Sequence, residues 1–205
     1  MRMIRLVHII SCLALALALA VPGFVHEVVA AEAPPSAFDK MSKAERDALI
    51  DELLERLSAA PNEEEGKGIE RTIQALWLTS GSPSIDLLMR RGLDALGDGD
   101  YDRAYFYFDE VVTFAPAYAE GWHRRAAIHY VREDYAAALK DIEQALRLEP
   151  RHFEALAGLG VILEDLGDRK GALDAYRRAL SLNPWLSHGK ARVAPLELEV
   201  EGRGI

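Results

Sequence analysis

The sequence contains a single cysteine, Cys12, among its 205 residues. Because Cys12 lies in the N-terminal segment described below, the rest of the chain is expected to have no disulfide, no thiolate nucleophile and no cysteine metal site. Phosphate-binding glycine loops, dinucleotide fingerprints and nucleophile elbows are also missing from the sequence. We therefore expect a protein that is not an enzyme and that needs no cofactor.

Basic residues are scarce relative to acidic ones, 24 against 33, and Arg124-Arg125 is too short a basic run to form a nucleic-acid surface. Half of the residues are hydrophobic, so the chain can bury a core. These features predict a folded protein that does not bind nucleic acid.

An N-terminal segment has the order of a secretory signal peptide. Arg2 and Arg5 precede an apolar stretch over residues 9–21, and small residues follow at 29–31. The stretch is short for a bilayer span. We expect residues 1–31 to be a signal cleaved after Ala31 or nearby, with residues 32–41 as a linker. The mature chain would carry 22 basic and 32 acidic residues, a net charge of −10, because cleavage removes Arg2, Arg5 and Glu27.

Two other interpretations of this segment stay open. The stretch could remain as an uncleaved anchor. Residues 9–12 also loosely resemble a lipobox, in which Cys12 would be lipidated, although most of the apolar run follows the cysteine rather than preceding it. A cleaved signal predicts a periplasmic or secreted protein that does not insert into the membrane after signal removal. Lipidation of Cys12 predicts an envelope adaptor held by lipid.

Three prolines mark an internal repeat. Pro116 and Pro150 are 34 residues apart, and Pro184 follows after another 34. Further positions keep this step, including the small residues Gly92/Ala126/Gly160 and Ala104/Ala138/Ala172 and the large residues Phe108/Ile142/Tyr176. Small residues allow two helices to approach closely, and large residues fill the space between them. A fixed step of this length predicts stacked two-helix units.

This pattern resembles the tetratricopeptide repeat family, particularly over residues 119–150 with Trp122, Tyr135 and Ala138. The resemblance implies an all-α fold, a right-handed α-solenoid of three tetratricopeptide repeats. The repeats are expected at residues 85–118, 119–152 and 153–186.

Helices are also predicted on both sides of the repeats. Ser42 and Glu45 form a capping-box pattern before leucines at helical spacing, and Asn62 with Glu65 begins a second helical pattern. We interpret residues 42–81 as a helical hairpin that caps the N-terminal end of the array. Residues 187–205 are expected to form a C-terminal cap and tail, with a short, kinked helix over about residues 187–200.

The resemblance implies that the first helices of the units line a concave groove, which we expect to bind a peptide or protein segment. Some family members hold the C-terminal carboxylate of heat-shock chaperones in a clamp, but the matching residues here, Met89, Leu93, Arg124, Glu154 and Gly158, do not form it. The expected groove residues are Met89, Arg90, Leu93, His123, Arg124, Ala127, Tyr130, Ala157, Val161 and Glu164.

Arg90 and Arg124 occupy the same place in successive repeats. We expect them to bind an acidic or carboxylate-bearing peptide, because the guanidinium fork matches a carboxylate. The competing interpretation is that they pair with nearby acids such as Asp94 or Glu120. The partner itself, a protein or peptide, is not identified by the sequence.

Metal sites are not expected. Asp98, Asp100 and Asp102 alternate as in a calcium loop, but Arg103 stands where such a loop needs glycine. His123 and His129 are six residues apart and point to different faces of a helix. The predicted function is an exported interaction module or assembly scaffold; the alternatives are a lipid-anchored envelope adaptor or a non-catalytic subunit of an envelope enzyme complex.

Overall fold

The computed structural model describes residue 38 and residues 40–202. The expected signal peptide, its cleavage position and Cys12 lie outside the described residues. Within them the structure contains nine helices and no strand, and none of these helices is long and apolar enough to span a membrane. The helices are α1 (Lys43–Ser58), α2 (Glu63–Trp77), α3 (Pro83–Gly97), α4 (Tyr101–Phe114), α5 (Ala119–Val131), α6 (Tyr135–Leu148), α7 (Phe153–Asp165), α8 (Arg169–Leu182) and α9 (Ser187–Val200).

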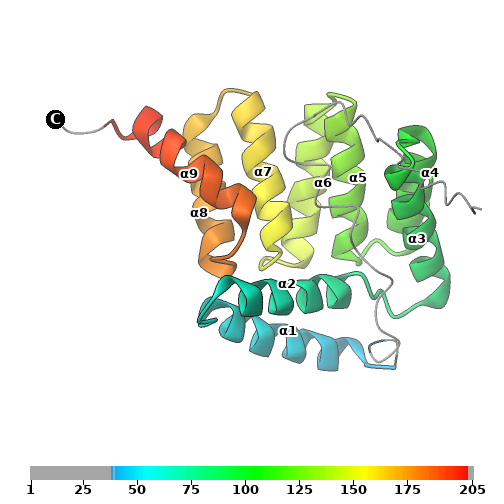
Figure 1. Cartoon of the computed structure of the whole chain (residues 1–205). Coiled ribbons are helices and arrows are strands. Elements are labelled where there is room, and N and C mark those ends of the chain that lie inside the picture. Colours follow the sequence, from blue (N-terminus) through cyan, green and yellow to red (C-terminus); the bar gives the residue numbers. More distant parts are fainter. Residues whose placement is uncertain (1–37, 39, 203–205) are drawn as a thin grey trace, which may run out of the picture.

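Helices α3 to α8 form three consecutive antiparallel pairs that stand side by side (Figure 1). The predicted all-α solenoid is therefore confirmed. The small residues of the 34-residue pattern lie where the two helices of a unit meet. Ala104, Ala138 and Ala172 are fully buried, and a Cβ on Gly92 would overlap the Phe108 ring. These contacts explain why the pattern alternates small and large side chains.

An aspartate caps the second helix of each unit. The side chains of Asp100, Asp134 and Asp168 each accept a hydrogen bond from the backbone N–H three residues later. Such N-caps satisfy donors that have no partner inside the helix. Asp100 therefore has a structural role in the acidic stretch that resembles the start of a calcium loop.

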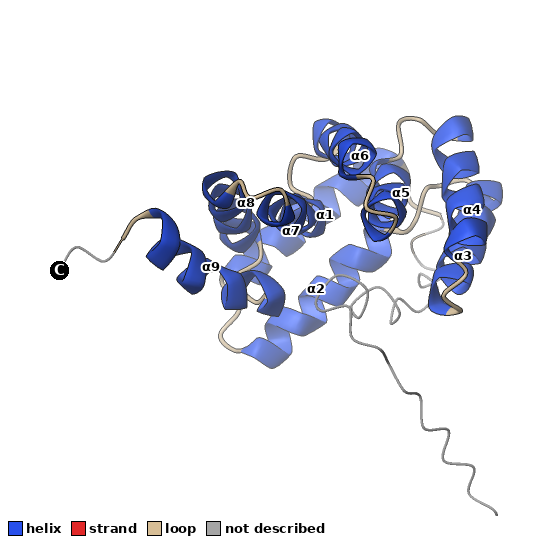
Figure 2. Cartoon of the chain, turned by 90° about the horizontal axis from the view of Figure 1, so that it is seen from above, coloured by secondary structure: helices blue, strands red, loops and turns tan. Residues whose placement is uncertain are grey.

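The α1–α2 hairpin does not stack on the first repeat, which corrects the predicted N-terminal cap. It runs across the lower ends of the repeat helices in Figure 1 and lies behind them in Figure 2. Its apolar residues share a core with Phe153, Leu156 and Tyr176 of the third repeat. The reason is the position of apolar surface: the hairpin has two rows of leucine and isoleucine to bury, and the third repeat supplies the partners.

Trp185 locks the hairpin to the C-terminal part of the array. Its indole N–H donates to the backbone carbonyl of Leu57 at 3.2 Å, and a Cβ on Gly66 would overlap the indole ring. The predicted kinked helix after the repeats is α9, which contains Pro195 and buries Leu196. The two ends of the described chain are therefore tied together through the third repeat.

Candidate binding surfaces

The expected groove residues divide into an open group and a buried group. Arg90 is exposed, and Leu93, Tyr130, Val161 and Glu164 are partly exposed. The expectation of an open groove is wrong for the other five, since they are buried at 2–7% exposure: Met89, His123, Arg124, Ala127 and Ala157. Sequence spacing placed these residues on one face but could not show that part of this face is covered.

The hairpin covers the first turns of α5 and α7. The Gln74 amide of α2 donates to the Glu154 carboxylate at 2.8 Å, and the Trp77 indole stacks on the His152 ring at 4.1 Å. The Trp77 carbonyl accepts a hydrogen bond from the Tyr118 hydroxyl at 2.9 Å. Helix α2 thus makes polar contacts where the sequence predicted a site for an external peptide.

A buried charged cluster lies beneath this contact, with Glu120 at its centre. Arg124 Nε donates to Glu120 Oε1 at 2.5 Å, and Arg124 Nη2 lies 3.9 Å from Glu154 Oε2. His152 Nε2 is 2.7 Å from Glu120 Oε2, and His123 Nδ1 is 3.4 Å from the same oxygen. A buried charge is costly unless it is paired, so each group depends on the others.

The cluster shifts the pKa values of its members. Burial lowers the pKa of His123 to about 4, even though the neighbouring Glu120 charge acts in the opposite direction. Burial alone would raise the pKa of Glu120, but Arg124 and the two histidines hold it well below its usual range. Burial also raises the pKa of Glu154, with Arg124 opposing that shift. At neutral pH the stable arrangement has an ionised Glu120 and a neutral His123.

Sequence reasoning missed that His152 joins His123. Ligand atoms of Glu120, His123 and His152 all lie within 4.8 Å of one another, a spacing that could suit a metal ion. However, His152 Nδ1 accepts a hydrogen bond from the Ala155 N–H at 3.3 Å, so the proton of a neutral ring is on Nε2, which faces Glu120. A metal ligand needs a lone pair on that nitrogen. The geometry therefore favours a hydrogen-bonded cluster that fastens α2 to the repeats.

The predicted arginine pair is separated by burial. Arg124 is 5% exposed and pairs with Glu120, the acid named in the competing interpretation. Arg90 is exposed and forms no ion pair with any described residue. Of the two arginines, only Arg90 can therefore bind an external carboxylate while the hairpin stays packed on the repeats.

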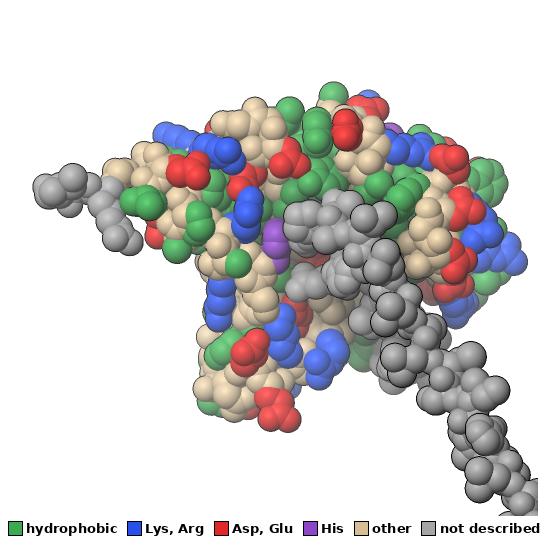
Figure 3. All heavy atoms as spheres, turned by 45° about the horizontal axis from the view of Figure 1, so that its top comes forward, with side chains coloured by type: hydrophobic (Ala, Val, Ile, Leu, Met, Phe, Trp, Pro, Cys, Tyr) green, Lys and Arg blue, Asp and Glu red, His purple; other side chains and the backbone are tan. Residues whose placement is uncertain are grey.

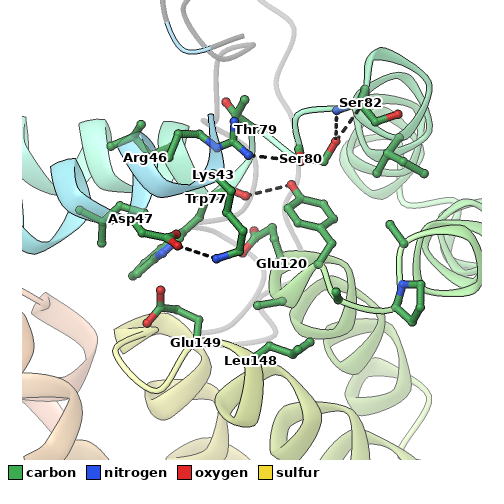
Figure 4. Close-up of a pocket in the computed structure, with 18 of the residues that line it drawn as sticks. Lys43, Arg46, Asp47, Trp77, Thr79, Ser80, Ser82, Glu120, Leu148 and Glu149 are labelled. Atoms are coloured by element: carbon green, nitrogen blue, oxygen red, sulfur yellow. Dashed lines mark hydrogen bonds and ion pairs between the residues drawn. The ribbon is translucent and has the colours of Figure 1, made fainter. Parts of the chain in front are cut away.

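A pocket of about 420 Å³ opens between the hairpin and the turns of the repeats (Figure 4). Its apolar wall includes Trp77, Ile85, Phe114 and Leu148, and Phe114 is 66% exposed. Its charged residues are Lys43, Arg46, Asp47, Glu120 and Glu149. Because α1 and the turn after α4 come together only in the tertiary structure, no spacing in the sequence could predict this pocket.

On the face drawn in Figure 3, acidic and basic side chains are interspersed. Ion pairs also connect neighbouring helices: Arg125 bridges Asp109 of α4 and Asp141 of α6, each at 2.7 Å. This arrangement does not form the basic stripe that follows a nucleic-acid backbone.

Stacked two-helix units, with a hairpin packed across the ends of their helices, define a helical-repeat solenoid (Figure 1). A family model for the tetratricopeptide repeat matches residues 123–184. A TPR repeat-containing protein of Rhizobium etli is 35% identical over 135 residues, which is 66% of this chain and 66% of that protein. The chain belongs to the tetratricopeptide repeat family.

A further sequence relative and a solved structure of similar fold were also found. The small glutamine-rich tetratricopeptide repeat-containing protein 2 of Saccharomyces cerevisiae is 27% identical over 160 residues, covering 78% of this chain and 45% of that protein. The first TPR of Spaghetti (RPAP3), solved bound to an HSP90 peptide, superimposes with a TM-score of 0.55 at 20% identity, over 57% of this chain and 93% of that one. The chain thus spans two thirds or less of the length of these curated relatives.

Proposed function

We propose that this chain is an exported, non-catalytic interaction module or scaffold that binds a segment of another polypeptide on the open part of its concave face. The observation that carries this proposal is that Leu93 on α3 and Val161 on α7 stay partly exposed, and that Arg90, also on α3, is exposed and forms no ion pair with any described residue. Apolar contacts beside a few charged groups are what peptide grooves use.

Membership of a repeat family supports the proposal. Stacked repeat units create the extended surfaces that such proteins use for binding. Glu120 and His123, whose pKa values are shifted by burial and by each other's charges, are buried in the cluster beneath α2 and contribute to the hairpin contact. They are therefore not available to a substrate.

The partner can be sought by crosslinking the native envelope fraction and recovering the protein with its neighbours. A purified partner is then titrated against Arg90→Ala and against Arg91→Ala, a matched control, because both arginines are exposed and lie next to each other on α3. We expect Arg90→Ala to weaken binding and to reduce its salt dependence, while Arg91→Ala does neither. Equal binding by the parent and the Arg90→Ala variant would remove the concave face as the binding surface.

Export is tested separately. Hypothesis: the mature protein begins near residue 32 and lies outside the cytoplasm, as the signal-like order of residues 2–31 indicates. The mass of the mature N-terminus decides among the three interpretations: loss of residues 1–31 supports a cleaved signal, an intact Met1 supports an anchor, and a lipid mass on Cys12 supports the adaptor.

A further inference from the structure

The pocket between the hairpin and the repeat turns is lined by a buried cation that forms no ion pair with any described residue. Arg46, on α1, is 8% exposed. Its guanidinium donates to two backbone carbonyls, those of Met41 at 2.6 Å and Ser80 at 3.4 Å. Among the described residues, no carboxylate lies within ion-pair distance of it. A guanidinium has five N–H donors, so these two bonds leave donors unused.

Each acid that lines the pocket is already paired with another cation. Asp47 pairs with Lys43 at 2.6 Å, Glu149 with Arg151 at 2.7 Å and Glu120 with Arg124 at 2.5 Å. Outside the lining, the Asp86 carboxylate accepts the backbone N–H of Ser80 at 2.8 Å. Arg46 is thus the one lining charge, among the described residues, whose counter-charge is missing. A buried guanidinium without an anion is costly, and a ligand carboxylate would remove that cost.

Large apolar groups lie beside Arg46 at the same pocket. Phe114 is 66% exposed and Leu148 is 36% exposed, and both line the opening. Phe114 and Leu148 occupy equivalent positions in successive repeats, because they are one 34-residue step apart at the ends of α4 and α6. A volume of about 420 Å³ is in the range of ligand pockets and accommodates a few side chains rather than a whole helix.

We propose that this pocket binds a short polypeptide segment in which an Asp or Glu side chain lies next to an aromatic or large aliphatic residue. The acidic side chain pairs with Arg46, and the apolar side chain packs on Phe114 and Leu148. This inference rests on the proposed function as an interaction module, but it names a second surface, since the open groove residues Arg90, Leu93 and Val161 do not line this pocket. It also names the chemistry of the segment that this surface accepts.

The test uses the mature chain and two blocked probe peptides, acetyl-Ala-Glu-Phe-Leu-Ala-amide and the same peptide with Gln in place of Glu. Binding is followed by NMR at the Trp77 indole N–H and the Gly81 amide. We expect the Glu peptide to bind at least about tenfold more tightly than the Gln peptide, because hydrogen bonds to charged groups are the strong ones. Equal binding of the two peptides would overturn the proposal.

Variants locate the binding. Phe114→Ala should weaken the Glu peptide about fivefold, whereas Phe106→Ala, a matched control on the same helix with 57% exposure and outside the pocket lining, should leave it unchanged. Both variants keep Arg46 and alter exposed side chains, so their melting curves should match the parent. If Arg46→Gln folds, it should abolish the preference for Glu over Gln; if it does not fold, the Phe114 and Phe106 pair still decides.

Three results would show that the pocket binds a different kind of ligand or that the peptide binds elsewhere. Binding of decanoate at the same signals without binding of the Glu peptide, or binding that requires a free C-terminal carboxylate on the peptide, would overturn the proposal. So would peptide-induced shifts confined to the concave residues near Arg90. In that last case the interaction module would stand and only this second surface would fail.

Discussion

Replacing Arg124 by alanine should destabilise the protein strongly, although the sequence placed this residue in an open groove. Arg124 is 5% exposed and its guanidinium pairs with Glu120 at 2.5 Å and faces Glu154 at 3.9 Å. The change to alanine would leave the buried Glu120 carboxylate and the partly buried Glu154 carboxylate without their cation. Breaking a buried ion pair by removal of one partner costs about 3–5 kcal/mol in the free energy of unfolding.

The loss of stability can also be expressed as a fall in the melting temperature. For a chain of this size each kcal/mol shifts the melting temperature by about 2–4 °C, so a fall of roughly 6–20 °C is expected. Glu154 has a raised pKa because of burial, and without Arg124 it should protonate more readily. The destabilisation should therefore be smaller at pH 5 than at pH 7.

Urea unfolding followed by circular dichroism measures the effect on the mature chain. Arg90→Ala is the matched control: Arg90 occupies the same repeat position but is exposed and unpaired, so its change should stay within about 0.5 kcal/mol. If Arg124→Ala also costs less than about 1 kcal/mol, the ion pair is not formed in solution and the buried cluster has been assigned incorrectly.

Three further predictions concern the core and its pH dependence. Burial lowers the pKa of His123 to about 4, whereas the unfolded side chain titrates near 6.5, so the free energy of unfolding should be highest above pH 6.5 and should fall by about 3 kcal/mol as the pH decreases towards 4. His123→Gln should make the free energy of unfolding, measured in urea, less dependent on pH over this range. An unchanged pH dependence would count against the assignment. Ala138→Trp should lower the melting temperature strongly, since Ala138 is fully buried and overpacking costs about 1–3 kcal/mol or more; an unchanged melt would remove it from the core. Gly66→Val should loosen the hairpin from Trp185, because a Cβ there overlaps the indole; tryptophan fluorescence should shift to the red, and an unaltered spectrum would contradict the contact.

Several elements could be predicted because their determinants are close together in the sequence. The capping box of Ser42 and Glu45 is present at the start of α1, and Asn62 caps α2 through the Glu65 N–H at 3.0 Å. The kink-prone helix after Pro184 is α9. Local hydrogen bonds and helical spacing decide such features, and a few adjacent residues encode them.

The candidate site could be predicted only in part. Arg90 is exposed and Leu93 and Val161 are partly exposed, whereas His123 and Arg124 are buried in a charged cluster. These two residues are covered because the Trp77 ring of α2 stacks on the His152 ring, with 4.1 Å between the ring centroids. Trp77 and His152 belong to elements far apart in the chain. No periodicity in the sequence reports such a contact.

The repeat could be recognised from the amino-acid sequence alone. The 34-residue step places small and large side chains where neighbouring helices meet, and each unit contacts mainly the units next to it in the chain. The packing position of the hairpin, and therefore which surfaces stay open, depends on contacts between residues far apart in the chain. Its contacts join residues 80 and 128 positions apart, Gln74 with Glu154 and Leu57 with Trp185. The physical reason is that an amphipathic hairpin packs on whichever exposed apolar surface buries it best, and that surface, formed by the third repeat and Trp185, exists only after the repeats have stacked.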